Sequence, residues 1–260
     1  MDFTTLLNHH IPDHAYRTLF WAGPIRFSLT KHLIVLWTVS AFLLALLSYA
    51  ARSRSRAGTL LRMGVEAAAL SVRDVVVDPI LGHGGRQYLH YFLTLFFFIL
   101  ACNLAGLIPG SATVTGNIAV TGALASCTFA LILFAGVRAN GPLPFLKHFW
   151  PVPSGIPAWV LPFVVFMPLI EVAGIVVKCV ALTIRLFANM IAGHIVALGF
   201  ISLIFILGAT SQVVGLMVAP VSVGLVVFVY LIELLVALLQ AFIFTLLTAV
   251  FVGGFMHAAH

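Results

Sequence analysis

No aspartate, glutamate, lysine or arginine occurs between residues 186 and 232, which read LFANMIAGHIVALGFISLIFILGATSQVVGLMVAPVSVGLVVFVYLI. The main break in this apolar stretch is the short sequence GATSQ at 208–212. The apolar runs on either side predict two long helices, about 170–207 and 213–256, that form an antiparallel hairpin. At 1.5 Å per residue they would be roughly 55 and 65 Å long, nearly twice the hydrocarbon core of a bilayer. Such helices fit a membrane only when strongly tilted or kinked.

The composition of the whole chain agrees with a membrane location. Hydrophobic residues make up 62% of the 260 residues and charged residues 8%, against about 45–50% and about 25% in soluble domains. This excludes a soluble enzyme, a disordered chain and a secreted disulfide scaffold. We attribute the net charge of +6 to basic loops at anionic lipid headgroups rather than to nucleic acid binding. Cys102, Cys127 and Cys179 lie in apolar runs without a CxxC pattern and are expected to be small buried hydrophobic residues.

Before the hairpin, the sequence predicts three further membrane crossings. Residues 33–51 form the first, and residues 88–137 form a helical pair joined by a tight outer turn at 109–111. Residues 1–32 would be an outer N-terminal segment, and they lack the pattern of a cleavable signal. Residues 138–158 would be a proline-rich loop, because the five prolines between 142 and 157 make a regular helix unfavourable. The tilted hairpin would fill 159–256.

Residues 52–87 differ from the rest because they are strongly basic. They contain six of the 13 lysines and arginines: Arg52, Arg54, Arg56, Arg62, Arg73 and Arg86. By the positive-inside rule this segment is cytoplasmic, which puts the N-terminus outside and the C-terminus in the cytoplasm. Arg62, Glu66 and Arg73 share one side of a helical wheel, which indicates an amphipathic helix on the membrane surface, with a solvated loop as the alternative. The predicted fold class is therefore an all-α polytopic membrane protein, a single membrane domain with five crossings and a surface helix.

Ionisable residues at membrane depth are costly and are usually functional. Glu171, Lys178 and Arg185 are each seven residues apart and form one stripe along the first hairpin helix. Glu171 and Lys178 can also be explained as an interfacial pair whose long side chains reach the headgroups. Arg185 lies about 21 Å beyond Glu171 and has no partner in its own flanking sequence. Because a guanidinium stays charged, we expect its partner to lie outside this chain.

The antiparallel hairpin fixes which polar side chains lie at the same depth. Counting outward from the break predicts that Arg185 is level with Gln240 and that His194 is level with Glu233. An imidazole beside a carboxylate can relay protons near neutral pH, or the two can form a structural buried ion pair. Asn189, one turn after Arg185, either lines the same cavity or makes a plain interhelical hydrogen bond.

The chain lacks the sequence patterns of known catalytic and nucleotide-binding sites. There is no HExxH spacing for a metal, no glycine-rich phosphate loop and no nucleophile elbow. We therefore expect no catalytic site, no cofactor, no metal and no directly bound nucleotide. Gly193 and Gly208 are interpreted as points of close helix packing.

Three motifs resemble one known family. They are IRLFANMIAGH at 184–194, LQAFIFTLLT at 239–248, and NLAGLIP at 103–109 followed by TGNIAVT at 115–121. Together they are similar to the signatures of subunit a of F-type ATP synthases, and the resemblance runs from about residue 85 to 255. Residues 1–84 match mainly in layout.

This resemblance implies the stator half of a rotary motor, which couples proton flow to ATP synthesis or hydrolysis. Protons would pass through two offset half-channels at the interface with a ring of c subunits, and peripheral-stalk b subunits would be further partners. The site residues then take these implied roles: Arg185 the essential charge, His194 and Glu233 the outer half-channel, Asn189 and Gln240 the surroundings of the arginine, and Glu171 the inner half-channel. The expected location is the bacterial inner membrane rather than the mitochondrial one.

Two other functions fit parts of the pattern. In a secondary transporter Arg185 would bind an anionic substrate, but the chain lacks the internal repeat that such transporters usually carry. An intramembrane hydrolase would need a Ser/His pair or metal-ligand spacing, and the sequence has neither.

Overall fold

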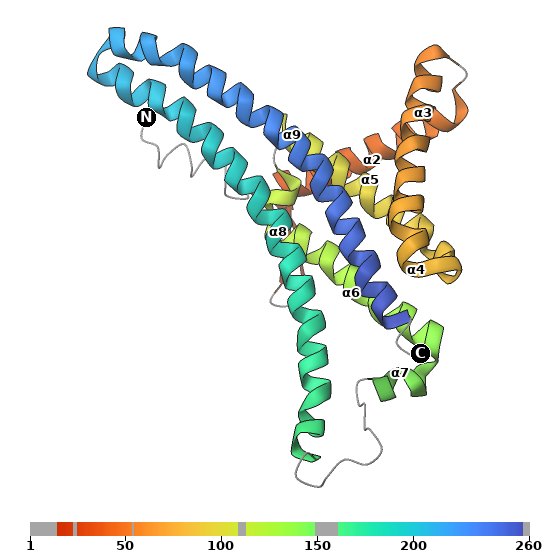
Figure 1. Cartoon of the computed structure of the whole chain (residues 1–260). Helices are drawn as coiled ribbons and strands as arrows, with labels where there is room; N and C mark the ends of the chain where they lie inside the picture. Colours follow the sequence, from red (N-terminus) through yellow and green to blue (C-terminus); the bar gives the residue numbers. More distant parts are fainter. Residues whose placement is uncertain (1–14, 23–24, 54, 109–112, 149–160, 257–260) are drawn as a thin grey trace. The chain divides into compact units, whose positions relative to one another are not determined.

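The structure is a computed structural model, and it describes residues 15–22, 25–53, 55–108, 113–148 and 161–256 (Figure 1). Most of these residues are helical. The elements are β1 Ala15–Ala22, β2 Ile25–Thr30, α2 Lys31–Arg52, α3 Arg56–Ser71, the π-helix η1 Val72–Val77, α4 Asp78–Gly85, the 3-10 helix η2 Arg86–Tyr88, α5 Leu89–Gly106, the 3-10 helix η3 Val114–Gly116, α6 Ile118–Asn140, α7 Pro142–His148, α8 Leu161–Thr210 and α9 Gln212–Met256. Five of the helical segments are long and apolar enough to cross a membrane, which confirms the predicted polytopic helical class.

The chain packs as two compact units, each assembled from three segments. The first unit contains residues 1–62, 97–117 and 186–241, and the second contains residues 63–96, 118–185 and 242–260. Both α8 and α9 therefore contribute one part to each unit. Arg185 is the last α8 residue of the second unit, and Leu186 is the first of the first unit.

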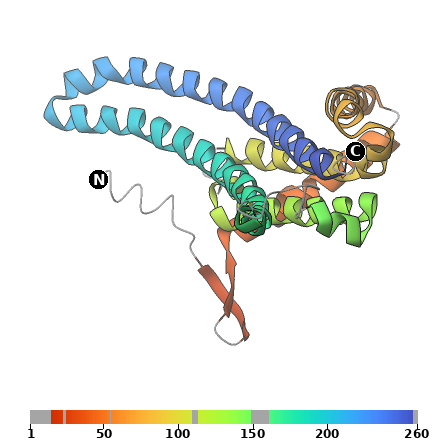
Figure 2. The same cartoon turned by 60° about the horizontal axis from the view of Figure 1, so that its bottom comes forward.

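A β-hairpin precedes the first crossing, which the sequence analysis did not predict. Strands β1 and β2 pair antiparallel, with Ala22 opposite Ile25 and Ala15 opposite Thr30, and they lead directly into α2 (Figure 2). Aromatic and β-branched residues are frequent in both strands, as is usual for strands. Thr30 then caps α2, because its hydroxyl accepts a hydrogen bond from the Leu33 amide at 3.4 Å.

The predicted hairpin is present, and its turn lies where the sequence places it. Helix α8 ends at Thr210 and α9 begins at Gln212, and the parts of the two helices next to this turn run side by side in Figures 1 and 2. A Cβ on Gly215 would lie 2.6 Å from the Gly208 Cα, so glycine at both positions lets the two backbones nearly touch. The close packing predicted at Gly208 is confirmed. With 50 and 45 residues, α8 and α9 are about 75 and 68 Å long.

The prediction of a proline-rich loop without regular helix over 138–158 is wrong at its start, where α6 continues to Asn140 and α7 follows. Helix α7 begins at Pro142, and α8 begins at Leu161, earlier than expected. Pro142 and Pro144 lie in the first turn of α7, where the amide N–H groups have no acceptor inside the helix, so the missing donor costs little. Pro168 is accommodated inside α8. The prolines between 149 and 160, like the predicted turn at 109–111, lie outside the described residues.

The second unit anchors the C-terminal end of α9. The Asn140 side chain, in the last residue of α6, donates a hydrogen bond to the Phe255 carbonyl at 2.8 Å. The rings of Phe145 and Phe255 lie 6.3 Å apart, and Gly136 packs against the Phe145 ring. Gly141 links α6 to α7 with a φ of +83°, a conformation that favours glycine. Helices α6 and α7 thus pack at the C-terminal end of the hairpin.

The basic segment that follows the first crossing is helical. Helices α3, η1 and α4 cover residues 56–85, which supports the helical interpretation over a solvated loop. Its position on a membrane surface stays a prediction. Asp74 accepts a hydrogen bond from Arg73 at 2.7 Å, and this bond and the charge of Asp74 raise the pKa of Arg73 above its ordinary value.

Candidate functional site

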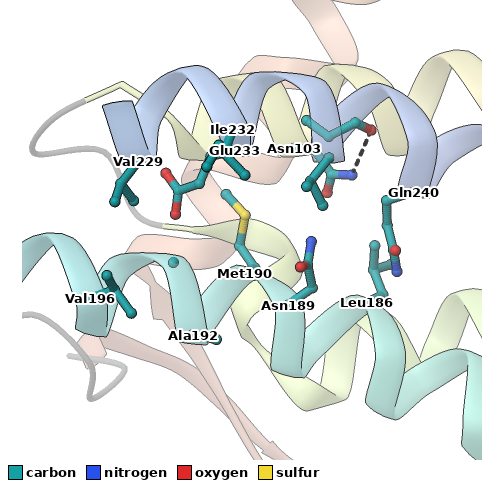
Figure 3. A pocket seen from close by; sticks show the side chains of 13 residues that line it. Asn103, Leu186, Asn189, Met190, Ala192, Val196, Val229, Ile232, Glu233 and Gln240 are labelled. Atoms are coloured by element: carbon teal, nitrogen blue, oxygen red, sulfur yellow. Dashed lines mark hydrogen bonds between the residues drawn. The ribbon is translucent and has the colours of Figure 1, made fainter. Parts of the chain in front are cut away.

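A cavity of about 260 Å³ lies between α5 and the parts of α8 and α9 that belong to the first unit (Figure 3). Most of its lining is apolar, but four polar side chains enter it: Asn103, Asn189, Glu233 and Gln240. Glu233 lies toward one end with Val229 and Val196, and Gln240 lies toward the other end with Leu186 (Figure 3). The cavity therefore has a carboxyl group at one end and carboxamides toward the other.

Several polar atoms of this cavity are buried without a hydrogen-bond partner in the described part of the chain. They are both carboxylate oxygens of Glu233, the Oδ1 of Asn103 and the Nε2 of Gln240. Buried polar groups in proteins are paired with protein atoms or with ordered water, since an unpaired one costs about 1–3 kcal/mol. Water occupies about 30 Å³ per molecule in the liquid, so the cavity has room for several molecules that could pair these atoms.

His194 and Glu233 lie at the same level on facing helices, as the hairpin register predicts. The His194 Nδ1 is 3.9 Å from the Glu233 Oε1, which is ion-pair distance but longer than a hydrogen bond. The same Nδ1 is 3.1 Å from the Met190 carbonyl, and because a carbonyl can only accept, Nδ1 carries the proton in this contact. The Nε2 of a neutral His194 is then free to accept a proton.

Gly193 makes room for the Glu233 side chain. A Cβ built at Gly193 would overlap the Glu233 Oε1 and lie 2.6 Å from its carboxyl carbon. The close packing predicted at Gly193 is therefore confirmed, and it is directed at the carboxyl group of the cavity.

Of the four polar side chains in the cavity, Asn103 is the one to which the sequence analysis gave no role, although it belongs to one of the three motifs. It is only 3% exposed, and its Nδ2 donates to the Ala237 carbonyl on α9 at 3.3 Å (Figure 3). Its role could have been predicted, because Asn103 is a carboxamide inside an otherwise apolar membrane helix. Such a side chain usually hydrogen-bonds to a neighbouring helix.

Arg185 precedes Leu186, which lines the cavity, and Asn189 follows one turn later on the same helix face. The Arg185 side chain is exposed and has no ion pair or hydrogen bond with any described residue. The expectation that its partner lies outside the chain stays a prediction. Because Arg185 and Gln240 belong to different units, their predicted equal depth stays a prediction.

Glu171 and Lys178 lie further toward the start of α8, in the second unit. The Lys178 ammonium lies over the Phe251 ring, 5.2 Å from its centroid, which is a cation–π geometry. Glu171 is half-buried. In the predicted row of charged residues Glu171, Lys178 and Arg185 along α8, Lys178 therefore contacts an aromatic ring of α9.

Cysteine burial departs from the prediction at one position. Cys102 is fully buried and Cys179 half-buried, but Cys127 is exposed on α6. A thiol on a membrane helix can face lipid without penalty because it behaves as a small apolar group. Within the described ranges, no three His, Cys, Asp or Glu side chains are placed to hold a metal ion.

Fold and site together define a polytopic helical membrane protein with titratable and carboxamide groups enclosed by a long helical hairpin. Comparison with known proteins gives the family. Residues 33–253 match the family model of the ATP synthase A chain. The chain therefore belongs to the ATP synthase A chain family.

Individual relatives agree with this assignment. The chain is 41% identical to ATP synthase subunit a of Chloroherpeton thalassium, over 92% of this chain and 69% of the relative. It is 45% identical to ATP synthase subunit a 2 of Chlorobium luteolum, over 88% and 65%, and 40% identical to the Myxococcus xanthus subunit a, over 92% and 76%. The chain spans about two thirds to three quarters of the length of these relatives.

Proposed function

We propose that this chain is the proton-translocating stator subunit of a rotary ATP synthase. Protons pass through two offset half-channels at the interface with a ring of c subunits, and their flow is coupled to ATP synthesis or hydrolysis. Family membership supports the assignment. The observation that carries the proton path is the cavity between α5, α8 and α9, in which both oxygens of the Glu233 carboxyl group are buried without a hydrogen-bond partner among the described residues.

The outer half-channel consists of this cavity and the water that fills it. Water hydrogen-bonds to the buried atoms of Asn103, Glu233 and Gln240, and so links the two ends of the cavity. His194 and Glu233 pass protons to this chain of water, because imidazole and carboxyl groups can both exchange protons near neutral pH when placed together.

Arg185 is the fixed charge that separates the two half-channels. It is exposed, permanently charged and without an ion-pair partner among the described residues. A carboxyl group of the c-ring that passes Arg185 is held ionised by this charge, because an opposite charge within a few ångströms favours the ionised form. A ring carboxyl group therefore releases its proton before it reaches Arg185.

The apolar surface of the hairpin supports the proposed membrane location and the c-ring as a partner. Large apolar side chains are exposed along α9 in the first unit, for example Leu216, Met217 and Leu231 at 78%, 72% and 62%. Lipid and the helices of the c-ring are the apolar surroundings that such a surface requires. We place the chain in the bacterial inner membrane, with its N-terminus outside, its C-terminus in the cytoplasm, and peripheral-stalk b subunits as further partners.

The role of the cavity is tested by a pair of glycine substitutions on α8. Gly193→Ala should insert normally, because the group in its way is the flexible end of Glu233, but the carboxyl group must move. We expect ATP-driven proton pumping in inverted vesicles to fall about tenfold, as small misplacements of reacting groups cost rate. Gly199→Ala is the matched control, since no atom lies within 4 Å of a Cβ there. If the two variants pump protons at the same rate, Glu233 is not part of the proton path.

Glu171 serves the inner half-channel, where it lowers the barrier for protons that leave toward the cytoplasm. Glu171→Gln should slow transport by about two- to fivefold without abolishing it, because water and other polar groups can take over in a wide vestibule. The measurement is the rate of ATP synthesis at a high proton gradient. An unchanged rate would mean that Glu171 is only an interfacial ion.

A further inference from the structure

The corner between α2 and α3 carries arginines that nothing else in the described chain neutralises. Residues 52–56 read RSRSR, and the nearest acidic residue in the sequence is Glu66. Arg52 and Arg56 are both exposed, and neither has an ion pair or a side-chain hydrogen bond within the described residues. The corner is therefore a local concentration of positive charge at the end of a membrane-crossing helix.

Arginines further along the same basic segment are different because each has an acidic partner. Arg73 donates to Asp74 at 2.7 Å, and Arg86 donates to both oxygens of Asp78 at 3.1 Å. These two arginines are compensated within the chain. Among the described arginines of this segment, the two without an acidic partner, Arg52 and Arg56, both lie at the corner.

Hydroxyl groups hold this corner in one conformation. The Ser55 Oγ accepts from the Gly58 amide at 3.1 Å and lies 2.9 Å from the Ser53 Oγ and 3.0 Å from the Tyr49 hydroxyl. Gly58 packs so closely on Ser53 that a Cβ there would overlap the serine side chain. Arg52 ends α2 and Arg56 begins α3, and these hydrogen bonds link the end of α2 to the start of α3.

We propose that this corner binds the headgroup of an anionic phospholipid. Guanidinium groups suit a phosphate because they donate two parallel hydrogen bonds and stay charged. A lipid fits better than an acidic protein segment because apolar surface adjoins the charge: Tyr49 and Leu60 are 50% and 70% exposed. The corner also follows a helix that is long and apolar enough to cross the membrane, so it lies at headgroup level. This proposal is independent of the proton path.

The test uses the full chain in vesicles that contain photoactivatable phosphatidylglycerol or photoactivatable phosphatidylcholine, with the labelled peptide identified by mass spectrometry. Residues 49–62 should be labelled by the anionic lipid at least about fivefold more than by the zwitterionic one, since one basic residue near an anionic surface gives about that factor. Arg52→Gln with Arg56→Gln should remove the preference. Arg52→Lys with Arg56→Lys should keep most of it.

The control is Arg73→Gln with Arg86→Gln. It also removes two arginines, but each of them has an acidic partner in the chain. This double variant should keep the preference for the anionic lipid. Equal labelling by both lipids in the wild type would overturn the proposal, as would an equal loss in the control. Millimolar inorganic phosphate that abolishes the labelling preference at constant ionic strength would identify a free-phosphate site instead. Cross-linking of the corner to an acidic polypeptide instead of lipid would make it a protein interface.

Discussion

Arg185→Ala is expected to abolish proton-driven ATP synthesis while the chain still inserts into the membrane. Without the fixed charge, a ring carboxyl group can stay protonated as it passes between the half-channels, so protons leak without useful rotation. The side chain is exposed and makes no ion pair within the described residues, so its removal leaves no buried charge of this chain unpaired. The measurement is ATP synthesis in energised vesicles, together with the amount of inserted protein.

Two further variants sharpen this prediction. Arg185→Lys keeps the charge but loses the planar, two-pronged donor group, and we expect it to fail as well. Arg138→Ala removes an exposed arginine at the end of α6 and should keep most of the activity. Normal coupled synthesis by Arg185→Ala would contradict the assigned role.

His194 and Glu233 should behave as one unit. Replacing His194 by Leu or Glu233 by Leu should reduce ATP-driven proton pumping by at least about tenfold, since a positioned proton donor or acceptor usually contributes that much or more. Their side chains lie 3.9 Å apart at the closest nitrogen and oxygen. The exchange His194→Glu with Glu233→His should therefore recover more activity than His194→Glu or Glu233→His alone, because the same two groups still meet at the same depth.

The comparison is made in inverted vesicles for the wild type, the single variants and the exchange. A suitable control is Ile195→Leu, a conservative change next to His194 on an exposed position of α8. If the exchange pumps no better than the weaker of His194→Glu and Glu233→His, the two side chains do not share one site.

Composition and spacing were sufficient to predict the five crossings and the hairpin. Long uncharged stretches have few alternatives to a membrane helix, and the break near Gly208 fixed the register that brings His194 and Glu233 together. This works because an antiparallel pair with a short turn has one register, so depth can be counted from the turn.

Other features could not be predicted because they depend on contacts distant in the sequence. The prolines of α7 were misjudged because their cost depends on whether they fall in the first turn of a helix. Asn103 is 134 residues away from its hydrogen-bond acceptor Ala237, and nothing in its local sequence identifies that partner. The β1–β2 hairpin lacks the strict alternation by which strands are usually predicted.

The central claim is that protons cross the membrane through the cavity beside Glu233. The most direct measurement is passive proton conductance in vesicles that contain the purified membrane sector, with the chain and its ring but without the ATP-hydrolysing part, under an imposed potassium-diffusion potential. We predict that wild-type vesicles conduct protons and that Glu233→Leu vesicles with the same protein content conduct at least about tenfold less. Equal conductance in the two preparations would contradict the account.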